Sequence, residues 1–225
     1  MFSFNLGKIP VTIHLWFLLV GVFLMGNVTS PPLVIMWLAI FFLSVLAHEL
    51  GHAFAGIAFG LEPRIDLHGM GGTTSWRHKN VSTAKKIIIS VAGPSIGIFF
   101  GGLLYLFSPV VLGENPSPLA DWAVDKLIFV NLVWGLLNLL PMLPLDGGNV
   151  MAHSLTAAMG DKGMRVAHYI SAAIAIGAGL LAFVMGYGWW SMGMAALFAF
   201  QNIKAIMPAQ QRGGPPTPPV APQQW

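Results

Sequence analysis

The chain has 225 residues, of which 56% are apolar and only 8% are charged, about a third of the charged fraction of an ordinary soluble domain. So few charged side chains cannot solvate the surface of a globule of this size, and we therefore expect a membrane protein. The absence of cysteine excludes disulfide scaffolds, thiolate metal sites and cysteine nucleophiles, so any metal must bind to histidine or carboxylate.

Six stretches are long and apolar enough to predict membrane-spanning helices. They cover residues 9–26, 32–60, 87–111, 127–145, 166–186 and 188–205. Of the 11 Lys and Arg residues, all but Lys126 fall on the side of the membrane that holds both termini. The positive-inside rule then places both termini in the cytoplasm. Topology thus explains the net charge of +3, and no nucleic-acid partner is needed.

The second predicted span contains the sequence His48-Glu49-Leu50-Gly51-His52. The two histidines are one helical turn apart on one face and can share a metal ion, and Glu49 lies beside them within reach of a metal-bound water. A carboxylate in an apolar span is costly, which makes Glu49 a functional candidate. The alternative is a pair of interfacial histidines.

The loop after this span predicts a short β hairpin at the membrane surface. Residues 65–68 alternate in polarity, glycines follow, and residues 73–76 can form the returning strand. The alternative is a solvated connection.

In the third span, Gly93, Gly97 and Gly101 repeat every four residues, which indicates close helix packing.

A second intramembrane carboxylate, Asp146, lies at the end of the fourth predicted span. The second and fourth spans run in the same direction, so Asp146 is expected at the depth of His48 and His52 and is our candidate for the third metal ligand. Two prolines and two glycines around it interrupt the helix, and broken backbone at membrane depth is tolerated where it lines a cavity. The competing candidates for the third ligand are His14, His153 and His168.

The last 18 residues, 208–225, contain six prolines and too few apolar side chains to build a core. We expect a disordered cytoplasmic tail here, and a single membrane domain over residues 1–207.

These motifs resemble those of the site-2 protease family, the compact intramembrane zinc metalloproteases (M50 type) of bacteria and archaea. The resemblance rests on His48–His52 and on Asn-x-x-Pro-x-x-Pro-x-Asp-Gly-Gly from Asn138 to Gly148. Weaker matches are residues 9–14 and 92–94. Gly97 stands where many members carry asparagine. The resemblance implies that the protein lies in a prokaryotic cell membrane. It also implies a single zinc ion held by His48, His52 and Asp146, with Glu49 as general base.

The expected fold is an all-α polytopic membrane protein with six transmembrane helices and a small membrane-associated β hairpin or sheet after the second helix. The expected reaction is hydrolysis of a peptide bond in or near a transmembrane segment of a membrane-protein substrate, with Glu49 activating a zinc-bound water. Asn138 is the candidate oxyanion partner, although a helix-packing amide would explain it too. Candidate substrate-binding residues are Ile65, Leu67, Gly71, Gly72, Pro141 and Pro144.

Two other functions stay open at this point. A zinc transporter or sensor also lines its path with histidine and aspartate, and a pseudoprotease would bind membrane proteins without cutting them. Glu49 favours hydrolysis, because an ion path has no particular need for a carboxylate beside the first histidine. The sequence leaves the oligomeric state and the identity of the substrate open.

Overall fold

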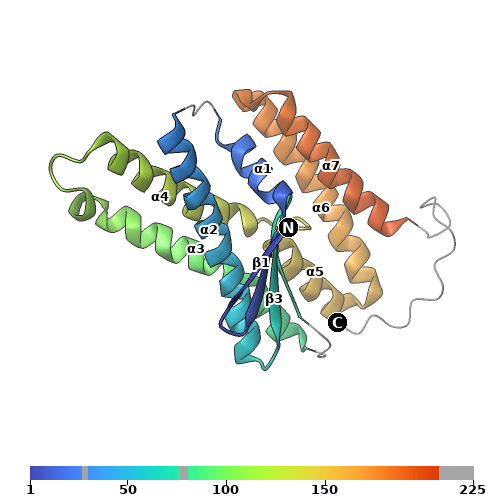
Figure 1. Cartoon of the computed structure of the whole chain (residues 1–225). Helices are drawn as coiled ribbons and strands as arrows, with labels where there is room; N and C mark the ends of the chain where they lie inside the picture. The colour runs from blue at the N-terminus through green and yellow to red at the C-terminus, as the bar shows by residue number, and fades with distance from the viewer. Residues whose placement is uncertain (27–29, 77–80, 208–225) are drawn as a thin grey trace. The chain divides into compact units, whose positions relative to one another are not determined.

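The structure is a computed structural model that describes residues 1–26, 30–76 and 81–207 (Figure 1). It divides into two compact units, Met1–Lys79 with Val91–Leu137 and Asn80–Ser90 with Asn138–Trp225. The predicted tail, residues 208–225, lies outside the described residues.

The first unit contains a four-stranded sheet in the order β1-β2-β3-β4. Its strands are β1 (Phe2–Leu6), β2 (Ile9–Ile13), β3 (Pro63–His68) and β4 (Gly71–Trp76). Two antiparallel hairpins, β1–β2 and β3–β4, join through the parallel pair β2–β3. Gly7, with φ of 59°, supplies the left-handed residue that the tight turn between β1 and β2 requires.

The helices of this unit are α1 (Leu15–Leu24), α2 (Pro31–Ala58), most of α3 (Thr83–Leu112) and α4 (Pro118–Asn138). Proline at its first position suits the start of α2, and Gly60, with φ of 77°, follows its end.

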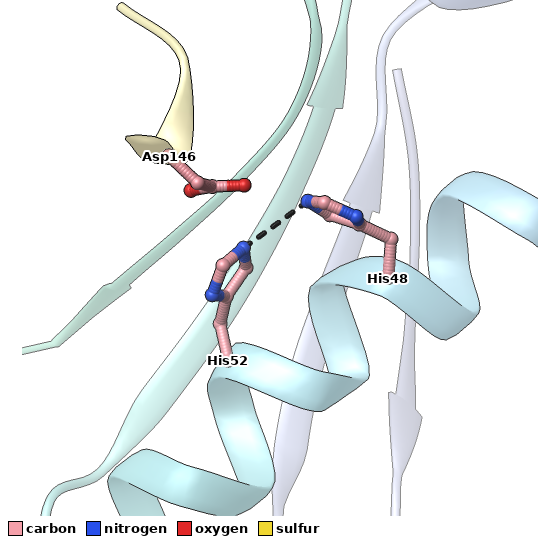
Figure 2. A group of neighbouring side chains, drawn as sticks. All are labelled: His48, His52 and Asp146. Carbon is pink, nitrogen blue, oxygen red and sulfur yellow. Dashed lines mark hydrogen bonds between the residues drawn. The ribbon is translucent and has the colours of Figure 1, made fainter. Parts of the chain in front are cut away.

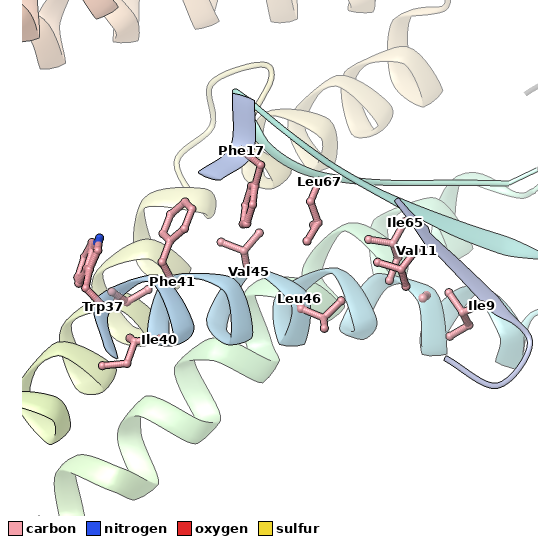
Figure 3. Packing of buried hydrophobic residues seen from close by; sticks show 12 residues of the cluster. Ile9, Val11, Phe17, Trp37, Ile40, Phe41, Val45, Leu46, Ile65 and Leu67 are labelled. Atoms are coloured by element: carbon pink, nitrogen blue, oxygen red, sulfur yellow. The ribbon is translucent and has the colours of Figure 1, made fainter. Parts of the chain in front are cut away.

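One face of the sheet packs on α2 and forms the core of the first unit (Figure 3). Every second residue of β2 and β3 points to this face, as the period of a strand requires, and these residues meet Val45 and Leu46 of α2. Phe17 of α1 stacks on Phe41 at 4.9 Å between ring centroids. The indole of Trp37 donates a hydrogen bond of 2.8 Å to the Gly21 carbonyl, which ties α2 to α1.

The second unit contains the beginning of α3, together with α5 (Asp146–Met159), α6 (Asp161–Ala182), the π-helical turn η1 (Phe183–Tyr187) and α7 (Trp189–Ile206). Helix α6 packs on both α5 and α7. Gly179 of α6 lies against Ala195 of α7 so closely that a larger residue would not fit, which is the small-residue packing typical of membrane helices.

Three helical segments in the described part of the chain are long and apolar enough to cross a membrane, namely Pro31–Ala58, Thr83–Leu112 and Asp161–Tyr187. Leu15–Leu24 is a shorter apolar helix. The six-span topology therefore stays a prediction.

Some predicted boundaries were wrong. Residues 9–13 form β2 and not the start of a helix, because an apolar, β-branched run does not distinguish a strand from a buried helix. The fourth apolar stretch, 127–145, is helical only to Asn138, and its helix begins at Pro118. The hairpin predicted after the second span is confirmed as β3–β4. The sheet contains two further strands, β1 and β2, which the sequence patterns did not predict.

Candidate metal centre and active site

Helix α2 brings the two histidines together as the spacing predicts. Both side chains are buried, and their Nε2 atoms lie 3.2 Å apart. Two nitrogens bound to one tetrahedral zinc at about 2.0–2.1 Å would be separated by about 3.3–3.4 Å. The histidine pair is therefore spaced to share a metal ion.

Asp146 is the first residue of α5. Among the described residues, the structure gathers one group of three possible metal ligands, His48, His52 and Asp146, whose ligand atoms all lie within 4.8 Å of one another (Figure 2). Two imidazoles and one carboxylate match the ligand set of a catalytic zinc, which leaves a coordination position open for water or substrate. The donor chemistry thus fits zinc.

The three competing histidines are absent from this group within the part of the chain that the structure describes. His14 directly precedes α1 and donates its backbone N–H to the Leu67 carbonyl at 2.8 Å. His168 contacts Asn202. Burial lowers the pKa of His153, and the nearby Lys86 ammonium lowers it further.

Glu49 is 4% exposed, and the side chain of Thr74, on β4, holds its carboxylate. The Thr74 hydroxyl lies 2.7 Å from Glu49 Oε2 and 3.0 Å from the Glu49 carbonyl oxygen. A hydroxyl has one hydrogen to donate, and the closer and more strongly accepting carboxylate is its better acceptor. We did not predict a role for Thr74, because only the folded sheet brings it to α2.

Two glycines leave room for these side chains. A methyl group on Gly72 of β4 would overlap the Glu49 side chain, and one on Gly93 of α3 would overlap the His52 imidazole. A methyl group on Gly51 would come 2.7 Å from the Ala92 carbonyl oxygen, so α2 and α3 are in backbone contact here. Close packing was the predicted role of the glycines in α3, and Gly101 confirms it by packing on Leu132 of α4.

Ile65 and Leu67 are core residues, which corrects their assignment as substrate-binding residues. Both are 0% exposed, and β3 is paired on both sides, with β2 and with β4. Neither the side chains of Ile65 and Leu67 nor the backbone of residues 65–67, which is paired on both sides, is free to meet a substrate.

Strand β4 instead provides the edge of the sheet next to Glu49, since it pairs only with β3 among the described strands. The Leu67 carbonyl accepts a hydrogen bond from His14, on the β2 side, so the Leu67–Gly72 pair is one of the non-hydrogen-bonded pairs that alternate along an antiparallel ladder. The backbone N–H and C=O groups of Gly72 and Thr74 consequently point to the outer edge, while those of Thr73 and Ser75 bond to β3.

Asn138 ends α4, and Pro141 and Pro144 lie in the segment 139–145 that leads to Asp146. A methyl group on Gly147 or Gly148 would overlap the backbone of this segment. The two glycines therefore allow the segment to fold tightly over the first turn of α5. The roles of Asn138, Pro141 and Pro144 stay predictions.

The chain is similar to several known proteins, although no protein-family model matches it. It is 31% identical over 160 residues to sll0528 of the cyanobacterium Synechocystis sp., which is named provisionally as a zinc metalloprotease; the match covers 69% of this chain and 38% of that protein. It is 28% identical over 180 residues to zinc metalloprotease MJ0392 of Methanocaldococcus jannaschii, covering 77% of this chain and 51% of that protein. The chain thus spans about half the length of these relatives or less.

The structure resembles that of a site-2 protease from Methanocaldococcus jannaschii, with a TM-score of 0.63 and 23% sequence identity. The match covers 97% of this chain and 99% of the other, so the two share a fold. Together with its long apolar helices, this fold makes the chain an integral membrane protein.

Proposed function

Because this chain belongs to the site-2 protease family of zinc metalloproteases, we propose that it is an intramembrane endopeptidase. It hydrolyses a peptide bond in or near a transmembrane segment of a membrane-protein substrate. The observation that carries this proposal is the buried Glu49 carboxylate next to two histidines whose Nε2 atoms are 3.2 Å apart.

His48, His52 and Asp146 would hold a single zinc ion. When bound, zinc supplies Lewis acidity, which lowers the pKa of water toward neutrality and polarises a peptide carbonyl. Glu49 accepts the proton of the attacking water and later passes it to the leaving amine. The side-chain amide of Asn138 donates a hydrogen bond to the oxyanion that develops on the carbonyl.

The substrate enters as an extended strand. The carbonyls of a transmembrane helix are occupied by internal hydrogen bonds, so the helix must unwind before attack. The outer edge of β4 offers backbone partners to the unwound segment, and Gly71 and Gly72, without side chains, let it approach closely. Pro141 and Pro144 line the other part of the substrate path.

The membrane arrangement that we propose has six spans and both termini in the cytoplasm of a prokaryotic cell. The ten-to-one distribution of Lys and Arg supports this orientation. Residues 1–207 form the protease domain, and the proline-rich residues 208–225 form a flexible tail.

Zinc transport is the second candidate function that the ligand set allows. A transport path would need the three ligands but not Glu49, and it would not need a threonine hydroxyl bonded to the Glu49 carboxylate. These two features favour hydrolysis.

The test compares newly formed protein termini in membranes of cells that express the native chain, Glu49→Gln or Glu62→Gln. Glu62 is exposed and is the matched control for the loss of one negative charge. We expect termini within or near transmembrane segments with the native chain and Glu62→Gln, and their disappearance with Glu49→Gln. If the three profiles agree while all three proteins are present and loaded with zinc, the chain is not a protease.

A further inference from the structure

The segment 139–145 leads into Asp146, and its backbone can form few hydrogen bonds of its own. Pro141 and Pro144 have no N–H group, and the turn bonds run from Met142 N–H to the Leu140 carbonyl at 2.7 Å and from Leu145 N–H to the Met142 carbonyl at 2.8 Å. Buried backbone groups left without partners are costly. The peptide groups of Leu143 find their partners in two side chains from other helices.

Ser171 of α6 binds the amide side of Leu143. Its hydroxyl oxygen accepts a hydrogen bond of 2.9 Å from Leu143 N–H and donates one of 2.7 Å to the Ala167 carbonyl. Ser171 is 0% exposed, so water does not compete for these bonds.

Asn202 of α7 binds the carbonyl side of Leu143. Its Nδ2 donates to the Leu143 carbonyl at 2.8 Å and to the Phe198 carbonyl at 2.9 Å, and the side chain is 3% exposed. Since both N–H donors are used, the Oδ1 atom can only accept a bond. The Nδ1 of His168, 2.8 Å away, must therefore carry the hydrogen, and this bond fixes the orientation of the amide.

Helix α5 is the third element that contacts the backbone of Leu143. A methyl group on Gly148 would overlap the backbone at Met142 and Leu143, so the first turn of α5 rests directly on this peptide. The side chains of Met142 and Leu145 pack with Ala172, Ala175 and Ala199 in the core of the second unit. The backbone three residues before Asp146 is thus held by α5, α6 and α7 together.

We propose that Ser171, Asn202 and His168 are positioning residues for the metal centre. Their side chains hold the backbone of Leu143 through hydrogen bonds, and we call these three residues the Leu143 clamp. The clamp fixes the start of α5, where Asp146 carries its carboxylate. This inference rests on the proposed function, since it requires Asp146 to be a metal ligand. It extends the site to polar residues of α6 and α7 that lie outside both sequence motifs.

The expected effect is on metal affinity. Groups that orient a metal ligand through hydrogen bonds typically change metal affinity 10- to 100-fold when they are removed. Loss of Ser171 or Asn202 would let the segment before Asp146 take other conformations, and the carboxylate would then be less often in the binding position.

The test measures zinc affinity of the purified full-length chain in detergent, by competition with a chromogenic chelator, for Ser171→Ala, Asn202→Leu and His168→Ala. Ser154→Ala is the matched control, because the Ser154 hydroxyl also bonds to a helix carbonyl, that of Val150 on α5, but does not reach Leu143. The visible spectrum of the cobalt-substituted protein reports the ligand geometry, and the melting temperature of the apo protein reports the fold.

We expect Ser171→Ala and Asn202→Leu to weaken zinc binding about 10- to 100-fold and to alter the cobalt spectrum. Each of these variants leaves one buried backbone group of Leu143 without its partner, so the apo melting temperature should fall moderately, with the fold retained. Ser154→Ala should keep the native melting temperature and bind zinc like the native chain. His168→Ala should have a smaller effect, because His168 acts through Asn202. If Asn202→Leu unfolds the chain, Asn202→Ala, which removes the donor to Leu143 without adding bulk or charge, takes its place with the same expected result.

Asp146→Ala separates failure of the clamp from failure of the proposed metal site. If Asp146→Ala abolishes zinc binding while Ser171→Ala and the Asn202 variant bind zinc like the native chain, the clamp is refuted and the metal site stands. If Asp146→Ala itself keeps native affinity, the proposed ligand set is wrong, and the clamp falls with it.

Discussion

Glu49 has a tightly defined environment for a side chain with three rotatable bonds. Gly72 leaves room for the stem of the side chain, and the Thr74 hydroxyl bonds to one carboxylate oxygen. Both residues come from β4, the strand whose outer edge we propose as the substrate site. The proposed general base and the strand proposed to receive the peptide are therefore in direct contact.

Thr74→Val tests the hydroxyl. The substitution keeps the shape of the side chain and removes a hydrogen bond to a charged group, which is worth about 1.5–3 kcal/mol. Since about 1.4 kcal/mol corresponds to a tenfold change in rate, kcat should fall about 10- to 100-fold with zinc content unchanged. Thr73→Val is the control, because Thr73 bonds to His68 on the other face of β4 and should cut at the native rate. Equal rates for both variants would show that Thr74 does not position Glu49.

Gly72→Ala and Gly93→Ala should separate proton transfer from metal binding. The added methyl group at position 72 displaces the flexible Glu49 side chain, so cleavage is lost while zinc is retained. At position 93 the methyl group meets the His52 imidazole, so zinc affinity itself should fall. Measurement of zinc content and cleavage on the same preparations checks this, with Gly56→Ala, which has ordinary contacts, as the neutral control. Loss of zinc in Gly72→Ala would contradict it.

At the scale of elements, sequence patterns predicted what local spacing determines. The common face of His48 and His52 on α2 follows from their four-residue spacing, and the β3–β4 hairpin follows from alternation around glycines. The parallel pairing of β2 with β3 joins residues more than 50 positions apart, and no local pattern specifies it. The burial of Ile65 and Leu67 could not be predicted for the same reason, since it depends on pairing with both β2 and β4.

Strand β4 gives a prediction about its own edge. Thr74→Pro removes the hydroxyl and also the outward-pointing N–H, whereas Thr74→Val removes the hydroxyl alone. Proline is tolerated on an edge strand when its N–H faces away from the sheet. Thr74→Pro should therefore cut substrate at least tenfold more slowly than Thr74→Val, with unchanged zinc content and circular dichroism. If the two variants cut equally fast, substrate does not pair with this edge.

For the whole molecule, the grouping of the three candidate metal ligands, His48, His52 and Asp146, could be predicted because these residues lie in short motifs. The polar residues that hold Glu49 and Leu143 could not, since Thr74, Ser171 and Asn202 come from distant elements and belong to no motif. The same limit applies to the spans, because an apolar run gives no helix boundary when a strand or a proline-rich segment adjoins it.

Zinc should also stabilise the folded chain. A ligand that binds only the native state at a free concentration 100 times its dissociation constant contributes about 2.7 kcal/mol. Removal of the metal by a chelator should therefore lower the melting temperature of the native chain, and added zinc should restore it. Neither treatment should affect His52→Ala, and a zinc-dependent shift in that variant would place the metal elsewhere.

Our main proposal is that Glu49 acts as general base beside a zinc ion bound by His48 and His52. It is tested most directly by measuring zinc content and cleavage on the same proteoliposomes, for the native chain, Glu49→Gln and His52→Ala. The substrate is a transmembrane protein identified from the termini that depend on Glu49. We expect the native chain to bind zinc and cut, Glu49→Gln to bind zinc without cutting, and His52→Ala to do neither. Cleavage by Glu49→Gln, or loss of its zinc, would contradict the assignment of Glu49 as the general base beside the metal.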